Sequence, residues 1–168
     1  MDQLTIDFAV YEGKKELMGI AKATLPDLSA ITQSISGAGI AGNVDAVAVG
    51  HFDAMTLGLE FRATTAGIYK LAEPRKHTLE LRIAQQKEDV ALDSTGIKHI
   101  FVVIPKSTKM GSVAPASPTD GSGEYAVRYW KTTVDGNVVQ EIDCINGKCI
   151  INGKDYLKSA RKALGKNY

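Results

Sequence analysis

Three glycines have the spacing of a phosphate-binding loop. Gly37, Gly39 and Gly42 match G-x-G-x-x-G, a pattern in which backbone N–H groups hold the pyrophosphate of a dinucleotide. Such a site needs a buried parallel strand before the loop and a helix that begins at the last glycine. Here a polar segment, residues 31–36, precedes the loop, and valines at alternating positions follow it. The sequence therefore favours a flexible packing loop over a nucleotide-binding loop.

The histidines and paired carboxylates form no recognisable catalytic set. His51, His77 and His99 are scattered singly, without the partners of a triad or the spacing of a metal-binding pair. Glu141 and Asp143 lie two residues apart and would share one face of a strand. That spacing is the minimum for paired-carboxylate catalysis, and it is also typical of a solvated face. We expect no enzyme activity, no cofactor and no metal site.

Two cysteines flank a turn signal. The pair Asn146-Gly147 between two strand-like segments favours a two-residue hairpin turn, which would place Cys144 directly opposite Cys149. That register would permit a disulfide. Because the cytoplasm keeps thiols reduced, the reduced pair is the favoured prediction.

Size and charge limit the possible functions. The chain has 168 residues and a mass of 18.0 kDa, which fits one domain over residues 1–168. Its formal net charge of +1 lacks the basic excess of a protein that binds nucleic acid through phosphates. Residues 154–168 hold five cations against Asp155 alone and carry +4, so the remainder carries −3. With no apolar segment of spanning length, synthesis and folding in the cytoplasm are expected.

Alternation of apolar and polar residues dominates the chain and predicts strands with one buried face. A turn is expected at Asp135-Gly136. The pattern predicts six to eight strands in one domain, and 100–104 is typical of a strand covered on both sides. The clearest strands are 55–62, 78–83, 100–104, 124–131 and 138–142.

Three segments break the strand pattern. Residues 36–50 are small and almost uncharged, which indicates a flexible loop that packs against something. Residues 105–123 are rich in Pro, Ser and Gly and predict a long exposed loop. A helix is predicted over 154–164, capped by Asn152 and ended by Gly165. Its narrow apolar stripe would consist of Leu157, Ala160 and Leu164.

Ordered motifs at the two ends of the chain point to a family. Near the start stands Leu25-Pro26-Asp27-Leu28, and the last forty or so residues contain Tyr129-Trp130-Lys131, Val134-Asp135-Gly136, Glu141-Ile142-Asp143, Asn146-Gly147, Ile151-Asn152-Gly153 and Ala163-Leu164-Gly165. In order and spacing these motifs resemble the major tail tube proteins of P2-like contractile phages and R-type bacteriocins. Residues 84–123 depart from that family's usual pattern.

The resemblance implies a fold and a mechanical function. The fold would be mainly β, a small antiparallel β-barrel or sandwich with a flanking C-terminal helix. Six copies would close a ring through strands contributed to a shared inner barrel, and rings would stack into a tube inside a contracting sheath. The tube would be a conduit for DNA or other cargo, without specific binding. Its partners would be further copies of itself, the sheath protein, the tube initiator or baseplate and the terminator, in a tail or tail-like particle assembled in the bacterial host cytoplasm.

Three features of the residues give candidate contacts within such a tube: the small residues of 36–50, the +4 charge and narrow apolar stripe of the C-terminal helix, and strand alternation. Contacts between subunits or rings are expected at Gly37, Gly39, Gly42, Asn43 and Asp45. The basic helix would meet the sheath through Lys158, Arg161 and Lys162. The lumen would be lined by one of two polar strand faces, either Thr56, Glu60 and Arg62 or Thr78, Glu80 and Arg82.

Two other functions remain open from the residues themselves. A monomeric β-sandwich that acts as a binding or adaptor module fits the strand pattern equally well. A dinucleotide enzyme would need helices between parallel strands, whereas only one helix, at the C-terminus, is predicted.

Overall fold

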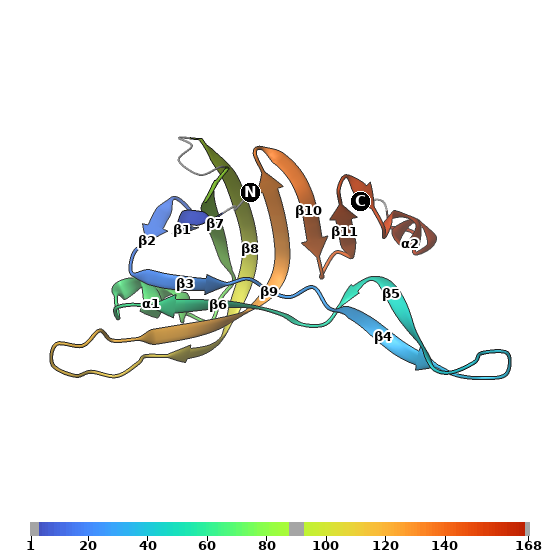
Figure 1. Ribbon diagram of the computed structural model, residues 1–168, viewed down its shortest axis with the longest axis horizontal. Coiled ribbons are helices and arrows are strands. Elements are labelled where there is room, and N and C mark those ends of the chain that lie inside the picture. The colour runs from blue at the N-terminus through green and yellow to red at the C-terminus, as the bar shows by residue number, and fades with distance from the viewer. Residues whose placement is uncertain (1–3, 88–92, 167–168) are drawn as a thin grey trace.

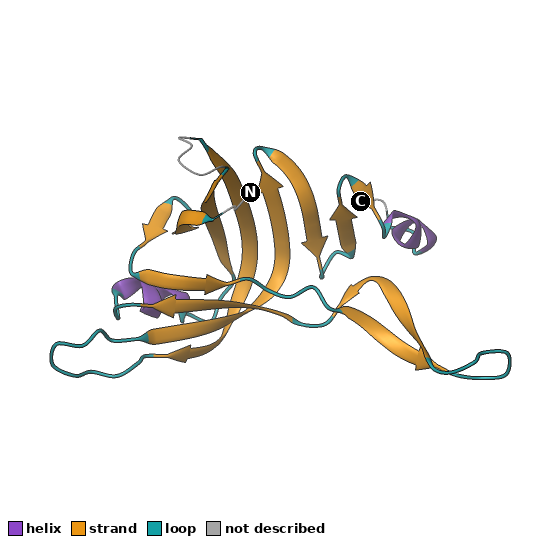
Figure 2. Ribbon diagram, in the orientation of Figure 1, coloured by secondary structure: helices purple, strands orange, loops and turns teal. Residues whose placement is uncertain are grey.

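The computed structural model describes residues 4–87 and 93–166. Strands dominate this part of the chain, and two short helices accompany them (Figure 2). The helices are α1 (Ala66–Leu71) and α2 (Lys158–Ala163). The strands are β1 (Thr5–Glu12), β2 (Lys15–Leu17), β3 (Ile20–Thr24), β4 (Ala30–Ile35), β5 (Val44–Phe52), β6 (Met55–Phe61), β7 (His77–Gln86), β8 (Ser94–Lys109), β9 (Gly121–Val134), β10 (Asn137–Asp143), β11 (Lys148–Ile151) and β12 (Lys154–Asp155).

Two long strands, β8 and β9, bend and take part in both layers of the fold (Figure 1). The first layer is a sheet of eight strands in the order β12-β11-β10-β9-β8-β7-β1-β2. In this layer one half of β8 pairs with β7, and one half of β9 pairs with β10. The other halves form a second layer of four strands in the order β3-β6-β9-β8, in which β6 pairs with residues 121–127 of β9. All these pairings are antiparallel.

The core lies between the two layers. Alternate residues of β6 are buried, and they face buried residues of β7 and β8 such as Leu79 and Phe101. Helix α1, which the sequence analysis did not predict, packs Ile68 and Leu71 into this core with no exposed surface. The mainly β, antiparallel and sandwich-like fold is confirmed. Across the described strands the sheet does not close into a barrel within one chain, because β2, β3 and β12 are edge strands.

Strand β8 is longer and less buried than its apolar run predicts. Ile100 and Val102 remain partly exposed, so the expectation of a strand covered on both sides was wrong. The predicted loop 105–123 is also too long, since β8 continues to Lys109 and β9 begins at Gly121. The pairing shifts register between Pro105 and Ser107, a bulge that accommodates the proline within the strand.

Strands β4 and β5 form a separate two-stranded hairpin, here called the arm, that projects from the sandwich (Figure 1). The predicted loop 36–50 is therefore wrong in its second half, because β5 begins at Val44 and only 36–43 form the loop. The alternating valines of β5 pair with the polar strand β4, which supplies the backbone partner that the sequence pattern did not reveal.

The C-terminal segment differs from the predicted helix 154–164. Lys154 and Asp155 form β12, and α2 spans only Lys158–Ala163. Asn152 does not cap this helix and instead has a positive φ of 53° in the preceding turn. Leu164, expected in the apolar stripe, is 71% exposed. The structure describes no helix long and apolar enough to cross a bilayer.

The turn between β10 and β11 contradicts the predicted two-residue hairpin. The Asp143 carboxylate accepts hydrogen bonds from the backbone N–H of Ile145 at 3.1 Å and of Asn146 at 3.0 Å. This arrangement closes a four-residue turn over 144–147, and Cys149 therefore pairs with Ile142. Cys144 does not lie opposite Cys149, and both thiols are free. Burial raises the pKa of each thiol, which leaves neither activated as a thiolate.

Candidate functional site

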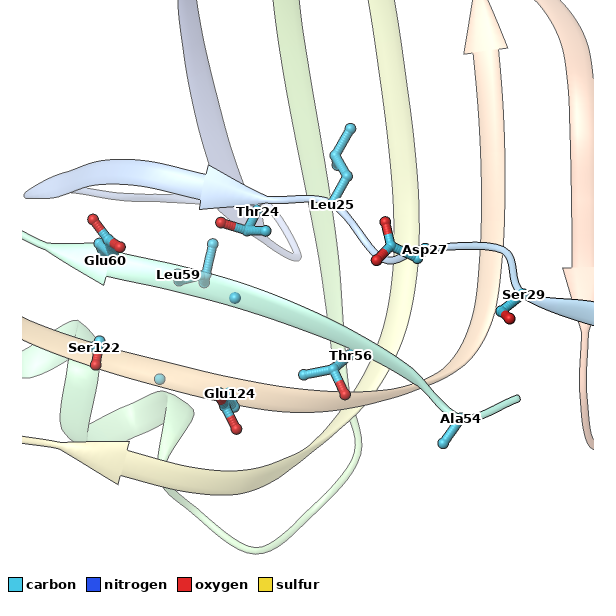
Figure 3. A pocket seen from close by; sticks show the side chains of 12 residues that line it. Thr24, Leu25, Asp27, Ser29, Ala54, Thr56, Leu59, Glu60, Ser122 and Glu124 are labelled. Atoms are coloured by element: carbon cyan, nitrogen blue, oxygen red, sulfur yellow. The ribbon is translucent and has the colours of Figure 1, made fainter. Parts of the chain in front are cut away.

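A concave polar surface covers the outer side of the second layer (Figure 3). It forms where β3, β6 and β9 lie side by side, and it encloses a cavity of about 580 Å³. Strand alternation creates it, because β6 turns Met55, Leu57 and Leu59 toward the core and leaves the intervening residues outside. The polar residues that line it are Thr24, Asp27, Ser29, Thr56, Glu60, Ser122 and Glu124.

The charge of this concave surface is acidic. Its lining includes the carboxylates of Asp27, Glu60 and Glu124 and no lysine or arginine. Lys106, on the neighbouring part of β8, donates a hydrogen bond to Thr56 Oγ1 at 3.4 Å. No cluster of metal-binding side chains occurs among residues 4–87 and 93–166. The carboxylates make this surface suited to repelling phosphate groups.

The two candidate lumen faces lie on opposite outer sides of the sandwich, because both inner faces bury the core. Thr56 and Glu60 line the concave surface, whereas Arg62 follows the end of β6 and is not among the lining residues. On the other side, Glu80 contacts Arg82 Nε at 2.7 Å and Lys98 Nζ at 3.4 Å. The second set, Thr78, Glu80 and Arg82, therefore belongs to a face of β7 on which Glu80 is paired with two cations.

The arm exposes apolar side chains on both of its faces. Ile31 and Ile35 of β4 are 44% and 47% exposed, and Val44, Val47 and Val49 of β5 are 54–59% exposed. A two-stranded hairpin with neither face covered has little stability of its own, and an exposed apolar surface of this kind marks a protein contact.

The loop at the end of the arm contains the three glycines of the G-x-G-x-x-G spacing. Gly39 and Gly42 have positive φ values of 90° and 117°. The loop joins two antiparallel strands, so a nucleotide site of the predicted kind has neither its parallel strand nor its helix here. Asn43 precedes β5, and Asp45 is its second residue, so the five candidate contact residues gather at the far end of the arm.

The second layer has two free edges. Among the described strands, β3 pairs only with β6. Residues 104–109 of β8 pair there only with β9, because β7 begins opposite Val103. Unpaired backbone N–H and C=O groups at such edges favour pairing with another chain. The four strands alternate in direction, so β3 of one copy placed beside β8 of another would again be antiparallel.

The basic C-terminal helix exposes two of its three candidate cations. Lys158 and Lys162 are exposed, whereas Arg161 is 7% exposed and forms an ion pair with Asp155. Arg161 Nη1 also donates to the carbonyl oxygen of Gly147 at 3.0 Å. The hydrogen bond from Arg161 lowers the pKa of Asp155 below its ordinary value. In this chain Arg161 therefore serves the fold, and its charge is not displayed on the helix surface.

His99 is buried and takes part in a polar network within the sandwich. Trp130 Nε1 donates to His99 Nδ1 at 3.1 Å, and Thr132 Oγ1 lies 2.9 Å from the same nitrogen. Because an indole N–H can only donate, Nδ1 is an acceptor and the ring is neutral, with its proton on Nε2. Burial lowers the pKa of His99, in agreement with this neutral form.

The remaining candidates for chemistry have structural partners. His51 is exposed, and its Nδ1 lies 2.9 Å from the carbonyl oxygen of Val49. Tyr129 donates from its hydroxyl to Glu141 at 3.1 Å, and Asp143 closes the turn described above. Burial and this contact raise the pKa of Tyr129 to about 12. The two carboxylates thus stabilise local structure separately.

Sequence reasoning missed part of the concave surface. Ser122 lies in the predicted loop 105–123, and Asp27 lies in a connection after β3, so neither carried a strand pattern. Glu124, unlike Ser122 and Asp27, lies within a predicted strand, as the first residue of 124–131. Its outward direction could have been predicted from its alternation with Tyr125.

Comparison with known proteins is consistent with this architecture. Two solved chains resemble the fold, both from cryo-EM structures of an extracellular contractile injection system, PVC. The first is from its sheath/tube terminator in the extended state, with 9% identity and a TM-score of 0.58, covering 76% of this chain and 94% of that chain. The second is from its sheath-tube complex in the extended state, with 10% identity and a TM-score of 0.56, covering 75% of this chain and 87% of that chain. A search of curated proteins found no match.

A protein family also matches nearly the whole chain. Residues 3–165 match the family described as phage tail tube protein FII. This match spans both layers of the sandwich, the arm and the C-terminal helix. The chain therefore belongs to the phage tail tube protein FII family.

Proposed function

We propose that this protein is the repeating subunit of the inner tube of a contractile tail, in which six copies form a ring and rings stack into a tube. Family membership gives it a structural role in a tail tube. The observation that carries the finer proposal is the second layer, a four-stranded sheet with a free edge on each side. A monomeric binding module would have no use for two such edges, and they would expose it to aggregation.

Ring closure follows from strand direction. The free edge of β3 in one copy pairs with residues 104–109 of β8 in the next, and the alternation of the four strands makes every junction antiparallel. Closure removes all free edges of the second layer, since a closed barrel has none. Six copies, the number implied by the resemblance, contribute four strands each to the shared barrel.

The concave acidic surface faces the bore in this arrangement. Asp27, Glu60 and Glu124 then line a conduit whose charge repels the phosphates of DNA, so that nucleic acid or another cargo passes without binding. This assigns Thr56 and Glu60 to the lumen and the β7 face with Glu80 to the outer side of the ring. The tube wall works by shape and charge, with no catalytic step and no cofactor.

The arm and the basic helix provide contacts with other subunits and with other proteins of the tail. The apolar arm contacts a neighbouring copy in the same or the next ring, with Gly37, Gly39, Gly42, Asn43 and Asp45 at its far end. Lys158 and Lys162 form the basic surface that meets the sheath. Head-to-tail stacking does not close on itself, so the initiator or baseplate and the terminator set the ends of the tube. The particle is a phage tail or tail-like particle assembled in the host cytoplasm.

Negative-stain microscopy of the purified protein over a concentration series tests the proposal. We expect rings at low concentration and stacked tubes at high concentration, with six-fold symmetry in end views. A persistent monomer at every concentration and salt condition would overturn the proposal and favour the monomeric binding module. Rings with another symmetry would retain the tube and correct the subunit number.

A further inference from the structure

The arm touches the C-terminal segment at its base. Outside that base it stands free of the sandwich, because β4 and β5 hydrogen-bond with none of the other described strands. Two features fix the base. The backbone N–H of Asp53 donates to the carbonyl oxygen of Ser29 at 2.7 Å, and Gly50 of β5 lies against the side chain of Leu157.

Leu157 approaches Gly50 more closely than it could approach any other residue at position 50. A Cβ atom added to Gly50 would lie 2.6 Å from Leu157 Cγ and 2.8 Å from both of its Cδ atoms. Gly50 also has a φ of +70°, a conformation that glycine adopts without strain. The glycine therefore permits both the bend of β5 and the approach of the leucine.

Leu157 is held in place by a polar network. Its backbone N–H donates to Asp155 Oδ1 at 3.1 Å, and its carbonyl oxygen accepts from the Arg161 N–H at 2.9 Å. Arg161 is paired with Asp155 and bonded to Gly147, as described above. Leu157 is 8% exposed although it lies at the start of a short surface helix. We refer to Asp155, Leu157 and Arg161 as the C-terminal clamp.

The clamp faces the base of the arm across a small crevice. The crevice has a volume of about 120 Å³, and its walls include Ile31, Gly50 and Phe52 of the arm on one side and Ile142 and Leu157 on the other. The C-terminal hairpin therefore packs against the point from which the arm departs. A small rotation at this point would move the far end of the arm over a large distance.

We propose that the C-terminal clamp sets the direction of the arm, with Gly50 and Leu157 as its positioning residues. A two-stranded arm without a covered face depends on contacts at its base for its angle to the sandwich. Among the described residues, Phe52 packs against the core at this base, and Gly50 meets Leu157 beside it. Direction matters for assembly, and this consequence rests on the proposed function of the arm as a subunit contact. An arm ordered before assembly loses less conformational freedom when it docks.

The test measures arm direction in the isolated subunit by the distance between two spin labels. One label is attached through Val44→Cys on the exposed part of the arm, and the other through Lys98→Cys on β8. Cys144→Ser and Cys149→Ala remove the native thiols. With the intact clamp we expect a single narrow distance distribution. Leu157→Ala should broaden or shift it, while circular dichroism and cooperative unfolding remain those of a folded sandwich.

Gly50→Ala provides an independent variant, because it leaves Leu157 and the core in place. The added methyl group must push against Leu157, so the distance should shift. Gly13→Ala is the matched control, since Gly13 has a similar φ of +64° with nothing within 4 Å of the added atom. Gly13→Ala should leave the distribution unchanged. The double variant Gly50→Ala, Leu157→Ala should lose the shift caused by collision and resemble Leu157→Ala.

The outcomes separate this inference from the proposed function. An unchanged distribution in folded Leu157→Ala and Gly50→Ala would overturn the positioning role, whatever the protein assembles into. A changed distribution together with normal rings would uphold the clamp and contradict the role of the arm in ring assembly. A changed distribution with loss of rings would support both.

Discussion

The imidazole of His77 lies between two oxygen acceptors, with Nδ1 3.0 Å from Glu12 Oε1 and Nε2 2.9 Å from the carbonyl oxygen of Glu73. Both oxygens are acceptors, so each contact is a hydrogen bond when the ring nitrogen that faces it carries a proton. His77 has no exposed surface, and the Glu12 side chain is only 9% exposed. These two contacts tie the end of β1 to the start of β7 and to the turn after α1.

Glu12→Gln should destabilise the fold by about 1–3 kcal/mol, because a buried charged partner of His77 is lost. Burial acts to raise the pKa of Glu12, and the hydrogen bonds from His77 and Arg75 outweigh it, so the pKa lies below its ordinary value. Urea unfolding measures the change. Arg75→Gln is the control, since the Arg75 side chain is 44% exposed and its loss should cost less than about 1 kcal/mol. Equal losses in the two variants would contradict a specific His77–Glu12 pair.

Stability should fall as the pH decreases from 7 to 5 through the titration of His99. Burial lowers the pKa of His99 below 6.5, so the unfolded chain binds a proton at a higher pH than the folded chain does. The free energy of unfolding therefore carries no penalty from His99 well above about pH 6.5, and it decreases as the pH falls below that value. Denaturant unfolding across this range tests the sign. In His99→Gln the pH dependence should be weaker, and an unchanged slope would show that other groups cause it.

Charges on the arm should prevent ring formation without unfolding the subunit. Val47 and Val49 are each 59% exposed, so Val47→Asp, Val49→Asp changes no core contact. If each valine is buried in the ring, each substitution removes about 1.5 kcal/mol or more of favourable burial free energy. The protein concentration needed for assembly should then rise more than tenfold. Size-exclusion chromatography over a range of protein concentrations measures this assembly threshold. Val138→Asp, at an exposed valine of β10, should assemble normally.

Reversal of the exposed basic residues should weaken binding of the sheath and leave rings intact. Lys158→Glu, Lys162→Glu inverts charge on the surface of α2, and co-sedimentation with sheath protein at several salt concentrations reads out the loss. Arg161→Ala should behave differently, because it breaks the ion pair with Asp155 and should cost about 2 kcal/mol or more of folding free energy. Sheath binding that survives the double reversal would place the contact elsewhere.

Cations in the concave surface should make assembled tubes bind DNA. Glu60→Lys, Glu124→Lys replaces two of its three carboxylates, and both side chains are exposed in the subunit. Tubes of the variant should retain DNA in a sedimentation assay at low salt and release it as salt rises, whereas the unaltered tubes should not retain it. Equal retention by both tubes would argue against a bore lined by this surface.

The sequence by itself determined which strands have one buried face. In β6, alternation over residues 55–61 correctly separated core positions from Thr56 and Glu60, because a strand turns successive side chains to opposite sides. The turn at Asp135-Gly136 was equally local, and the structure gives both residues positive φ values of 49° and 83°. The ordered C-terminal motifs also indicated the family, which the match over residues 3–165 confirms.

Only the tertiary structure decided how these elements are used. The Asp143 side chain closes a longer turn and so moves Cys144 out of register with Cys149, and Asp155 holds Arg161 inside a segment that periodicity assigned to an exposed basic helix. Hydrogen bonds of this kind depend on the full path of the chain, whereas a sequence pattern records only spacing. The same reason explains the arm. Segment 44–52 is a strand because it pairs with β4, and Gly50 is constrained because Leu157, distant in the sequence, packs against it.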